Sequence, residues 1–438
     1  MLTAADAEVR QRRVAVALAE RGLGTGDRLG VVAPSSADLL VLVLGALRRA
    51  IVPVLVNPSL LPGEQDGLLA DADCALVLRG DEVAGLASDG DDRQGVELAP
   101  VPLARPMHYT SGTGGTPKGV WSGVLGEADA MALVDEERAL WGFTADDVHL
   151  VCSPLHHSAP VRFAAGTVLA GGTVVLLPRF DPRVAAQAIA VHRPTTTFMA
   201  PAHLQRLRSL DDVGLPDLSS FRLLAHAGAP CPEPLKRWAI DALPAGTVWE
   251  FYGSTEGQFT ACPPDDWLAR PGTVGRARPH RELAVDAEGV VWCSVPDYAR
   301  FEYWRDGEKT AAAWRGDAFT VFDLGRIDEG GFLFLDARRD DLVISGGVNV
   351  YPAEVERVLA SMPGIGEVAV FGAADDRWGQ RVCAAVTGAV DPQELVAYAR
   401  AHLAPYKCPK QVIVVPEIPH TPMGKLRRST LAADLGVT

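Results

Sequence analysis

The stretch YTSGTGGTPKGV, from Tyr109 to Val120, combines glycines, small hydroxyl side chains and one lysine. Its glycines allow a tight turn in which backbone N–H groups approach anionic oxygens, and its lysine adds a mobile positive charge. A Walker loop would place Gly-Lys directly before Ser or Thr, whereas here Pro117 precedes Lys118 and Gly119 follows it. The stretch therefore predicts a phosphate-binding loop of another type, although flexible surface loops share this composition. The predicted phosphate contacts are Thr110, Ser111, Gly112, Thr113, Gly114, Thr116 and Lys118.

Length, composition and charge limit the classes of protein that this sequence fits. A chain of 438 residues, of which 48% are hydrophobic and 22% charged, is typical of a globular protein with a large domain and a smaller one. Its formal net charge of -14 argues against nucleic acid and anionic membranes as partners, since both attract basic surfaces. The seven cysteines are scattered and form no C-x-x-C pair, which indicates reduced thiols and predicts a cytoplasmic protein without a zinc site.

Apolar strands alternate with helices over most of the chain. Before the predicted loop, RLGVVAP and IVPVLVNP read as strands on either side of an apolar helix, DLLVLVLGALRRA. After it, TVVLLP, TTTFMAP, FRLLAHAGAP and TVWEFYG read as strands with helices between them. This alternation predicts an α/β fold of mostly parallel sheets flanked by helices, with ligands at the carboxyl ends of the strands. The Gly-, Asp- and Pro-rich stretch 89–106 is predicted to be an exposed connection.

The pattern changes near residue 340. From there to the C-terminus, EVERVLASM and ELVAYARAHL read as helices, and EVAVFGA, RVCAAVTG and QVIVVP read as strands. About a hundred residues of α+β pattern are enough for a separate small domain. We therefore predict two domains, one at residues 1–339 and one at residues 340–438.

Six further stretches follow the predicted loop in order. They are PLHHSAP (154–160), AHAGAPCP (225–232), FYGSTEG (251–257), FDLGRID (322–328), ARRDDLVISGGVNVYPAEVE (337–356) and PHTPMGKLRR (419–428). Together with the loop they run over nearly the whole chain and resemble the AMP-binding, adenylate-forming enzymes, which include acyl-CoA synthetases, aryl-CoA ligases and luciferase. The resemblance implies an AMP-binding adenylation domain followed by a mobile C-terminal domain that carries a catalytic lysine.

The resemblance assigns several nucleotide contacts to FYGSTEG. It places the ring of Tyr252 against adenine, Thr255 near the α-phosphate and Glu256 on a magnesium ion, and it gives Gly253 to both the ATP and the acyl sites. The chemistry of these side chains agrees, since a flat ring can stack on a base and a carboxylate is a hard ligand for a hard dication. On its own, the stretch reads more readily as a plain strand followed by a polar turn.

Other nucleotide contacts come from three separate stretches. The resemblance places the backbone of Gly228 and Ala229 along the adenine pocket, Asp323 on the ribose hydroxyls, and Arg338 around the ribose and phosphates. A loop aspartate would otherwise be expected to cap a helix. The family usually has glycine directly before this aspartate, but this chain has Phe322. A bulky ring at this position is expected to narrow the nucleotide or acyl site.

The C-terminal stretches carry the residues that the resemblance links to domain movement and catalysis. Asp340 corresponds to the hinge, and Gly346 and Gly347 correspond to the loop that lines the CoA tunnel after rotation, although any tight turn would need such glycines. Lys425 corresponds to the catalytic lysine, whose ammonium can reach both the attacking carboxylate and the α-phosphate. With Lys118 and Glu256, it completes the predicted catalytic set.

Contacts to the acid are predicted in and after PLHHSAP. The resemblance places His157 near the acyl pocket, where we assign it to substrate contact without an acid–base role. Arg162 is a candidate partner for a second carboxylate or polar group of the substrate, although a surface or interdomain charge fits equally. We expect a small or medium-sized acid, aromatic acids included.

The resemblance implies a ligase that uses ATP and Mg²⁺ to form an acyl-adenylate and then, with coenzyme A, an acyl-CoA thioester, releasing pyrophosphate and AMP. Two alternatives stay open: transfer of the acyl group to a carrier-protein thiol or an amine, and a non-catalytic nucleotide-binding relative. Retention of Lys118, Glu256 and Lys425 together argues against the second. A monomer or a homodimer is expected.

Overall fold

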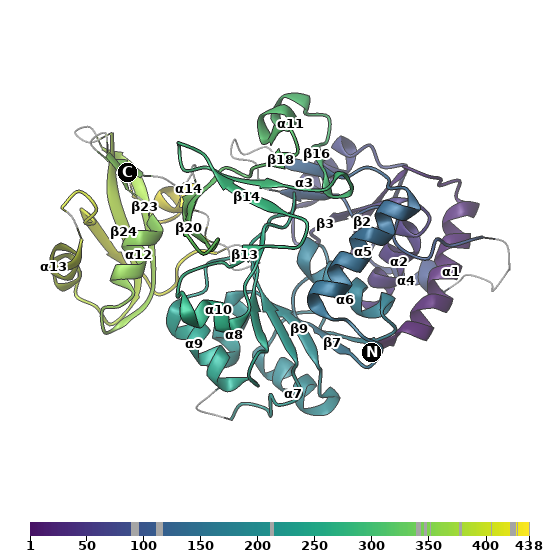
Figure 1. The fold of residues 1–438 in the computed structure, drawn as a ribbon, viewed down its shortest axis with the longest axis horizontal. Coiled ribbons are helices and arrows are strands. Elements are labelled where there is room, and N and C mark those ends of the chain that lie inside the picture. The colour runs from purple at the N-terminus through teal and green to yellow at the C-terminus, as the bar shows by residue number, and fades with distance from the viewer. Residues whose placement is uncertain are drawn as a thin grey trace. The chain divides into compact units, whose positions relative to one another are not determined.

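The chain is divided by its contacts into two compact units (Figure 1). The computed structural model describes residues 1–88, 96–110, 117–210, 214–338, 343–345, 348–350, 352–375, 379–403, 405–420, 426 and 428–437. Unit 1 comprises Met1–Pro271, Gly275–Glu282 and Cys293–Phe319, and unit 2 comprises Gly272–Val274, Leu283–Trp292 and Thr320–Thr438. The predicted domain boundary between residues 339 and 340 lies outside the described residues and stays a prediction.

Unit 1 begins with a small parallel sheet in the order β3-β2-β4. Its strands are β2 (Arg28–Val32), β3 (Val52–Val56) and β4 (Leu76–Arg79). Four helices accompany it: α1 (Ala4–Glu20), α2 (Ala37–Leu47), α3 (Pro62–Asp71) and α4 (Asp81–Ser88). The Ser36 hydroxyl starts α2 by accepting a hydrogen bond from the Leu39 N–H at 3.1 Å. Residues 39–47 of α2 are all buried, which explains its apolar sequence.

A second, six-stranded sheet has the order β1-β8-β7-β9-β10-β11 and is parallel except for the edge strand β1. Its strands are β1 (Leu2–Thr3), β7 (Val148–Val151), β8 (Thr173–Leu176), β9 (Thr196–Met199), β10 (Leu223–His226) and β11 (Val248–Glu250). The helices around it are α5 (Glu127–Trp141), α6 (Ser158–Leu169), α7 (Pro182–His192), α8 (Pro201–Arg208), α9 (Glu233–Ala242) and α10 (Pro264–Ala269).

Successive side chains of this sheet enter two different cores. Met199 and Leu224 pack with residues of α7, α8 and α9, whereas Phe198 and Leu223 pack with aromatic side chains of α5 and α6. The helices α5 and α6 lie together on that second face (Figure 1). Because the other five strands are parallel, the loops that follow them open at one edge of the sheet.

Short antiparallel elements complete unit 1. The strands β5 (His108–Thr110), β6 (Lys118–Trp121) and β16 (Glu302–Tyr303) form a sheet in the order β16-β6-β5. The remaining elements are β12 (Thr260–Ala261), β13 (Arg276–Ala277), the 3-10 helix η2 (Asp297–Ala299), α11 (Gly307–Ala313), β17 (Trp314–Arg315) and β18 (Ala318–Phe319). The strands β14 (Glu282–Val285) and β15 (Val291–Ser294) each contain residues of both units.

Unit 2 contains a two-stranded sheet and a mixed sheet. The first pairs β19 (Asp323–Ile327) with β20 (Leu333–Arg338). The second contains β21 (Val343–Ser345), β22 (Val348–Val350), β23 (Ile365–Asp375), β24 (Gly379–Gly388) and β25 (Gln411–Val414). Its helices are α12 (Pro352–Leu359), α13 (Pro392–His402) and α14 (Arg428–Asp434). The predicted fold class is therefore confirmed.

The stretch 89–106 differs from its prediction where it is described. Leu98, Val101 and Ala104 are buried, with exposed fractions of 9, 6 and 4%. The N–H groups of Ala99 and Leu103 donate to backbone carbonyls just after and at the end of α2. Residues 96–106 thus form a packed segment, because the apolar residues between the prolines find partners in the core. Among the helices that the structure describes, none is long and apolar enough to cross a bilayer.

Candidate active site

The predicted phosphate loop connects two strands of a hairpin. β5 and β6 pair in antiparallel register, with Thr110 opposite Lys118, so the two residues stand on either side of the loop's base. Lys118 is half-buried. The residues Ser111, Gly112, Thr113, Gly114 and Thr116 lie outside the described residues, and their phosphate contacts stay predictions.

Tyr303 links the two predicted catalytic residues of unit 1. Tyr303 is opposite Val120 in the β6–β16 ladder, which brings it beside the strand that begins with Lys118. The Lys118 ammonium lies 4.9 Å from the centre of the Tyr303 ring, a cation–π contact. The Tyr303 hydroxyl donates to Oε1 of Glu256 at 3.0 Å, and Glu256 is 7% exposed. One tyrosine side chain thus contacts a cation through its ring and a buried carboxylate through its hydroxyl.

The loop after β11 forms a compact turn that places Glu256. The Ser254 N–H donates to the Gly257 carbonyl at 2.8 Å, and the Gln258 side chain donates to the Ser254 carbonyl at 3.2 Å. A Cβ atom on Gly253 would lie 2.9 Å from the Gly257 carbonyl oxygen and closer still to the Gln258 side chain, so only glycine fits there. The turn therefore fixes the direction of the half-buried Thr255 and of Glu256.

Tyr252 begins this turn and Gly228 begins the neighbouring one. The Tyr252 ring lies 4.7 Å from the ring of Phe259, centre to centre, and its N–H donates to the Thr260 hydroxyl. Gly228 and Ala229 follow β10, the strand next to β11. Gly228 has a φ of +92°, a conformation that favours glycine. The predicted adenine contacts therefore lie at the carboxyl edge of the same sheet.

The loop after β7 opens at this edge too and leads into α6. His157 is the N-cap residue of α6, and its ring centre lies 4.3 Å from that of His156. Arg162 lies on α6, and its guanidinium contacts the Phe251 ring at 5.2 Å. The predicted acyl contacts His157 and Arg162 are therefore on one helix, beside the strand that leads to Tyr252.

Two further histidines in this region are neutral near pH 7. Nδ1 of His108 lies 3.0 Å from the His156 carbonyl oxygen. Burial lowers the pKa of both His108 and His156 to about 4. Neither side chain therefore adds positive charge beside Arg162.

Asp323 stands at the start of β19 in unit 2, 6% exposed. Its Cα partner in the β19–β20 ladder is Arg338, so the two residues assigned to the ribose are adjacent in one sheet. Phe322, directly before Asp323, has a φ of +62°, in the left-handed region that favours glycine. The backbone therefore adopts here a conformation that glycine would reach without strain, although the side chain is bulky. Asp340, Gly346, Gly347 and Lys425 lie outside the described residues.

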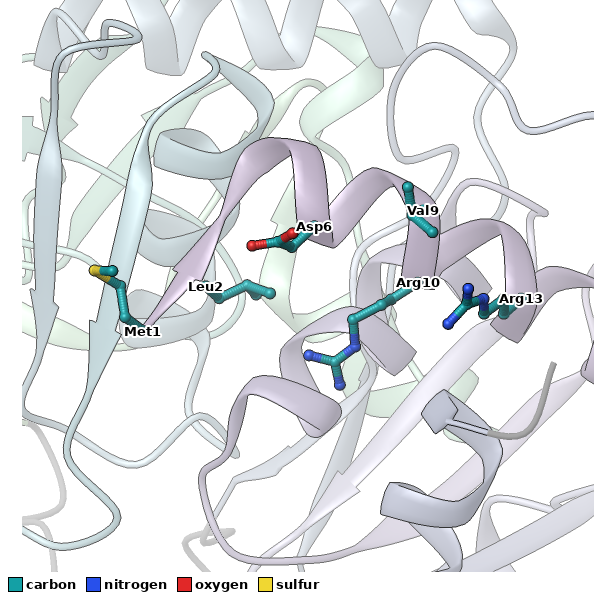
Figure 2. Close-up of a pocket in the computed structure, with 6 residues that line it drawn as sticks. All are labelled: Met1, Leu2, Asp6, Val9, Arg10 and Arg13. Carbon is teal, nitrogen blue, oxygen red and sulfur yellow. The ribbon is translucent and has the colours of Figure 1, made fainter. Parts of the chain in front are cut away.

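A pocket of about 330 Å³ lies at the N-terminus (Figure 2). None of the predicted site residues lines it. Arg10 and Asp38 form an ion pair, while Met1 and Val9 are exposed. The lining residues are Met1, Leu2, Asp6, Val9, Arg10 and Arg13. This pocket plays no part in the candidate active site.

Comparisons with known proteins decide the family. The family described as AMP-binding enzyme matches residues 1–293, and the family described as AMP-binding enzyme C-terminal domain matches residues 354–425. The chain belongs to the AMP-binding enzyme family. It is 31% identical to the long-chain-fatty-acid–CoA ligase FadD13 of Mycobacterium tuberculosis, over 100% of this chain and 94% of that protein.

Solved structures of this AMP-binding family share the fold across nearly the whole chain. The amide bond synthetase McbA from Marinactinospora thermotolerans has a TM-score of 0.85 and 29% identity, covering 98% of this chain and 94% of that one. The o-succinylbenzoate CoA synthetase MenE from Bacillus subtilis, in complex with ATP and magnesium ion, has a TM-score of 0.84 and 26% identity at the same coverage. These matches confirm the predicted family and fold.

Sequence reasoning missed Tyr303. Its short stretch, Glu302–Tyr303, carries no motif, and its partners Lys118 and Glu256 are distant in sequence. Only the pairing of β16 with β6 brings them together. No local signal in the sequence could have identified it.

Proposed function

We propose that this AMP-binding enzyme is an AMP-forming acid–CoA ligase, which makes an acyl-adenylate and then an acyl-CoA thioester. The observation that carries this proposal is the group formed by Lys118, Tyr303 and Glu256. An ammonium and a metal-binding carboxylate held near one another can bind and orient a phosphate chain. The CoA ligase FadD13 supports the same activity, because the match covers 100% of this chain and 94% of that protein.

Glu256 suits a magnesium ion. Carboxylate oxygens are the ligands that Mg²⁺ prefers, and the Tyr303 hydroxyl orients this carboxylate as an outer-shell partner. The MenE complex with ATP and magnesium ion supports the use of this metal. When bound, magnesium would neutralise part of the negative charge on the phosphates.

In the first half-reaction, a carboxylate oxygen of the acid attacks the α-phosphorus of ATP, and the bond from that phosphorus to the β-phosphate oxygen breaks. The products are the acyl-adenylate and pyrophosphate. Lys118 and the loop hydroxyls hold the departing phosphates, Tyr252 and the backbone at Gly228 hold adenine, and Lys425 stabilises the developing charge.

In the second half-reaction, the CoA sulfur attacks the acyl carbon and loses its proton, and AMP leaves. We propose that the C-terminal domain rotates about Asp340 between the two steps, withdrawing Lys425 and presenting Gly346 and Gly347 to the CoA chain. One active site would then serve two reactions through a hinge motion.

A second acceptor class has specific support. The amide bond synthetase McbA shares the fold at a TM-score of 0.85, so an amine acceptor is the alternative for the second step. A carrier-protein thiol would use the same adenylate. A cytoplasmic location and a monomeric or homodimeric state stay predictions.

Pyrophosphate release from magnesium ATP, measured across a panel of carboxylic acids with and without CoA, tests the proposal. The Lys425→Ala variant should lower the rate by roughly 100-fold or more, the size of effect seen when one stabilising group is removed from a transition state. Lys410→Ala is the matched control, since this lysine is exposed and outside the predicted catalytic set. Acid-dependent release that survives in Lys425→Ala would contradict the assigned role, and AMP with an amide product would identify an amine acceptor.

A further inference from the structure

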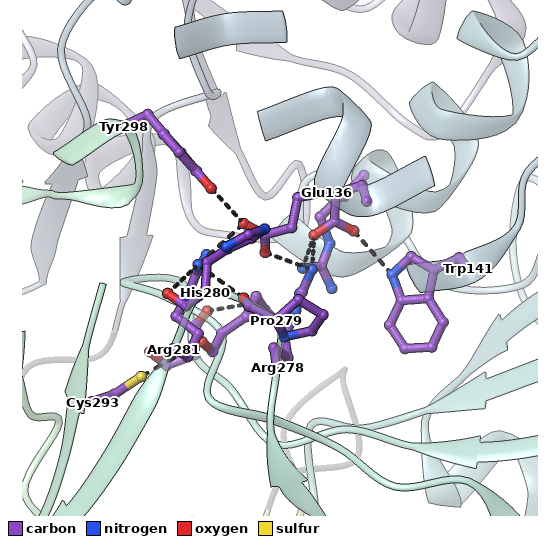
Figure 3. A network of polar contacts seen from close by, with 12 residues as sticks. Glu136, Trp141, Arg278, Pro279, His280, Arg281, Cys293 and Tyr298 are labelled. Carbon is purple, nitrogen blue, oxygen red and sulfur yellow. Dashed lines mark hydrogen bonds and ion pairs between the residues drawn. The ribbon is translucent and has the colours of Figure 1, made fainter. Parts of the chain in front are cut away.

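Three arginines surround two glutamates inside unit 1, and a fourth, Arg105, is close enough to two of them for their charges to affect its pKa. Figure 3 shows part of this network, with Arg278 and Arg281 beside Glu136. We call Arg105, Arg162, Arg278 and Arg281 the arginine cluster. Arg278 and Arg281 follow β13, and Arg105 precedes β5. The two glutamates, Glu136 and Glu137, are neighbours on α5.

The two carboxylates are shared among three of these arginines. Arg278 Nη2 lies 3.2 Å from Glu136 and 2.5 Å from Glu137. Arg281 pairs with Glu136 at 3.1 Å, and Arg162 Nη1 pairs with Glu137 at 3.4 Å. The hydroxyl of Tyr298 donates to Glu136 as well. Both carboxylates are therefore already engaged by more than one donor.

Arg105 has no carboxylate partner among the described residues. Its Nη2 donates to the Arg300 carbonyl oxygen at 2.7 Å and to the Ala299 carbonyl oxygen at 3.4 Å. Four guanidinium groups and two carboxylates leave an excess of two positive charges. Because His108 and His156 have pKa values of about 4, they do not change this balance near pH 7.

Much of the cluster is enclosed, although Arg105 is only half-buried. The side chain of Arg278 is 0% exposed and that of Arg281 is 4% exposed, whereas the side chain of Arg162 retains 18%. Buried positive charge without a matching anion is unfavourable, because burial removes hydration. Burial and the neighbouring arginines lower the pKa of Arg105 to about 10. Burial also lowers the pKa of Arg162 to about 10, although Glu137 opposes the shift.

Several buried nitrogens of the cluster have no hydrogen-bond partner among the described residues. They are Nε of Arg105, Nε and Nη2 of Arg162, Nε and Nη1 of Arg278, and Nε of Arg281. On Arg162, Nε and Nη2 form one edge of the planar guanidinium, while Nη1 is the atom that meets Glu137. That edge is a fork of two N–H groups whose spacing matches the two oxygens of a carboxylate.

The cluster adjoins the region assigned to the acid substrate. Arg162 lies on α6, which begins after His157, and its guanidinium stacks on Phe251, the residue before Tyr252. His108 contacts the carbonyl of His156 and is also close enough to Arg105 for that arginine to lower its pKa. Arg162 keeps a larger exposed fraction than Arg278 or Arg281 and lies on the helix that borders this region, so it is the member nearest a substrate at this site.

We propose that the arginine cluster is a subsite for a second carboxylate of the acid substrate, with Arg162 as its direct contact, so that the enzyme activates one end of a dicarboxylic acid. The proposal rests on the function proposed above. The bound carboxylate supplies the missing negative charge and pairs with Nε and Nη2 of Arg162, which have no hydrogen-bond partner among the described residues. Arg105, Arg278 and Arg281 add positive potential at the site, and Arg278 and Arg281 hold Glu136 and Glu137 in place.

The test compares dicarboxylic acids with their own monomethyl esters, from malonate to adipate and for the phthalates. The ester keeps the carbon skeleton of each acid, removes one charge and adds only a methyl group. We expect at least one dicarboxylate to exceed its ester in kcat/KM for pyrophosphate release by roughly 100-fold or more, since a site built for a charged group rejects analogues that lack it. Esters that react as well as every diacid would overturn the proposal.

Two variants test whether Arg162 is responsible for the preference for diacids. Arg162→Gln should remove most of the preference, mainly by raising the KM for the diacid more than the KM for the ester. Arg206→Gln is the matched control, because Arg206 also lies over a phenylalanine, Phe180, at 5.1 Å but is outside the cluster. An unchanged preference in Arg162→Gln would overturn the assignment of this residue. A phosphonate analogue that outperforms the carboxylate would overturn the choice of a carboxylate.

A binding measurement separates this inference from the proposed function. Isothermal titration of the unmodified protein with the same diacids and esters, in the presence of ATP without magnesium, reports recognition without turnover. Tighter binding of a diacid than of its ester, lost in Arg162→Gln, supports the subsite even if no acid gives pyrophosphate release. Equal binding overturns it even if ligation occurs.

Discussion

Two buried polar networks in unit 1 differ in their charge balance. The arginine cluster has four cations around two carboxylates. The second network, which we call the lysine triad, consists of Lys236 on α9, Glu250 at the end of β11 and His226 at the end of β10. Lys236 Nζ lies 3.1 Å from Glu250 Oε2 and 2.5 Å from His226 Nε2, and Lys236 is 0% exposed.

The triad is balanced, because its single ammonium is matched by a single carboxylate. Burial and then the nearby Lys236 charge hold the pKa of His226 well below its usual range, so this histidine accepts a hydrogen bond without adding charge. The triad joins the ends of the two strands that lead to Gly228 and Tyr252. A balanced network of this kind needs no ligand, whereas the arginine cluster is incomplete without an anion. The comparison teaches that buried charge supports the fold in one place and indicates a binding site in the other.

Breaking the triad should give the largest loss of stability. Lys236→Met leaves Glu250 buried without its partner and should lower the free energy of unfolding by about 3 kcal/mol near neutral pH. Burial raises the pKa of Glu250 and Lys236 opposes this, so the variant's carboxyl has a pKa further above that of the unfolded chain. At lower pH the buried Glu250 carboxyl is protonated, and the folded variant tolerates this neutral form. The loss of stability should therefore grow as the pH rises from about 5 to 8.

Chemical denaturation at several pH values measures this deficit. The double variant Lys236→Met, Glu250→Leu should recover most of the lost stability, because it removes both charges. If Lys236→Met alone were as stable as the parent protein, the Lys236 and Glu250 charges would not balance one another in the folded protein.

The second largest effect on stability is expected from acid, through His108 beside the arginine cluster. His108 has a pKa of about 4 in the folded protein, mainly because of burial, against about 6.5 in the unfolded chain. Between these values the unfolded state binds the extra proton, so stability falls as the pH drops. The expected loss is about 1.4 kcal/mol per pH unit over that range.

The difference between the parent protein and His108→Gln isolates this contribution, since other buried histidines remain in both. Unfolding free energies measured between about pH 7 and 4.5 should fall less steeply in the variant. If the unfolding free energies of the parent and the variant changed in parallel with pH, His108 would have the same pKa in the folded and the unfolded protein.

A smaller effect is expected at Phe322, where the unfavourable feature is a backbone angle instead of a charge. Phe322→Ala and Phe322→Gly remove the same ring, but only glycine adopts the observed φ of +62° without strain. The glycine variant should be more stable than the alanine variant by about 1 kcal/mol, even though glycine has more freedom when unfolded. Thermal unfolding of both variants measures the difference, and an alanine variant of equal or greater stability would argue against strain at this position.

The smallest change in stability is expected for Arg162→Gln. The substitution loses the contact with Glu137, but that carboxylate keeps Arg278, and one excess positive charge disappears. These effects should nearly cancel, leaving the unfolding free energy within about 0.5 kcal/mol of the parent, as is usual for substitutions that break no essential contact. A loss as large as that of Lys236→Met, measured in the same denaturant series, would make Arg162 a structural member of a balanced network.

Much of the fold follows from local sequence patterns. The predicted strands TVVLLP and TTTFMAP contain β8 and β9, because their apolar runs are short and are bounded by turn residues. The stretch 96–106 was predicted wrongly, since its burial depends on carbonyl groups near the end of α2 that are distant in sequence.

Some residues of the candidate site are indicated by local sequence, and others are indicated only by the fold. Lys118, Glu256 and Asp323 could be proposed from motifs, and their roles stay predictions. Tyr303 and the arginine cluster could not, because their partners come from strands and helices that meet only in three dimensions. Arg162 was recognised as a candidate, but the excess of charge around it was visible only in the folded chain.

The most direct measurement of the central claim uses an acid labelled with oxygen-18 in its carboxylate, incubated with magnesium ATP, CoA and the unmodified protein. If the carboxylate oxygen attacks the α-phosphorus, that oxygen remains on the phosphate when the thiol displaces AMP. Mass spectrometry should then find one labelled oxygen in AMP for each acyl-CoA formed, and none in pyrophosphate. Labelled inorganic phosphate together with ADP, or unlabelled AMP, would contradict an acyl-adenylate.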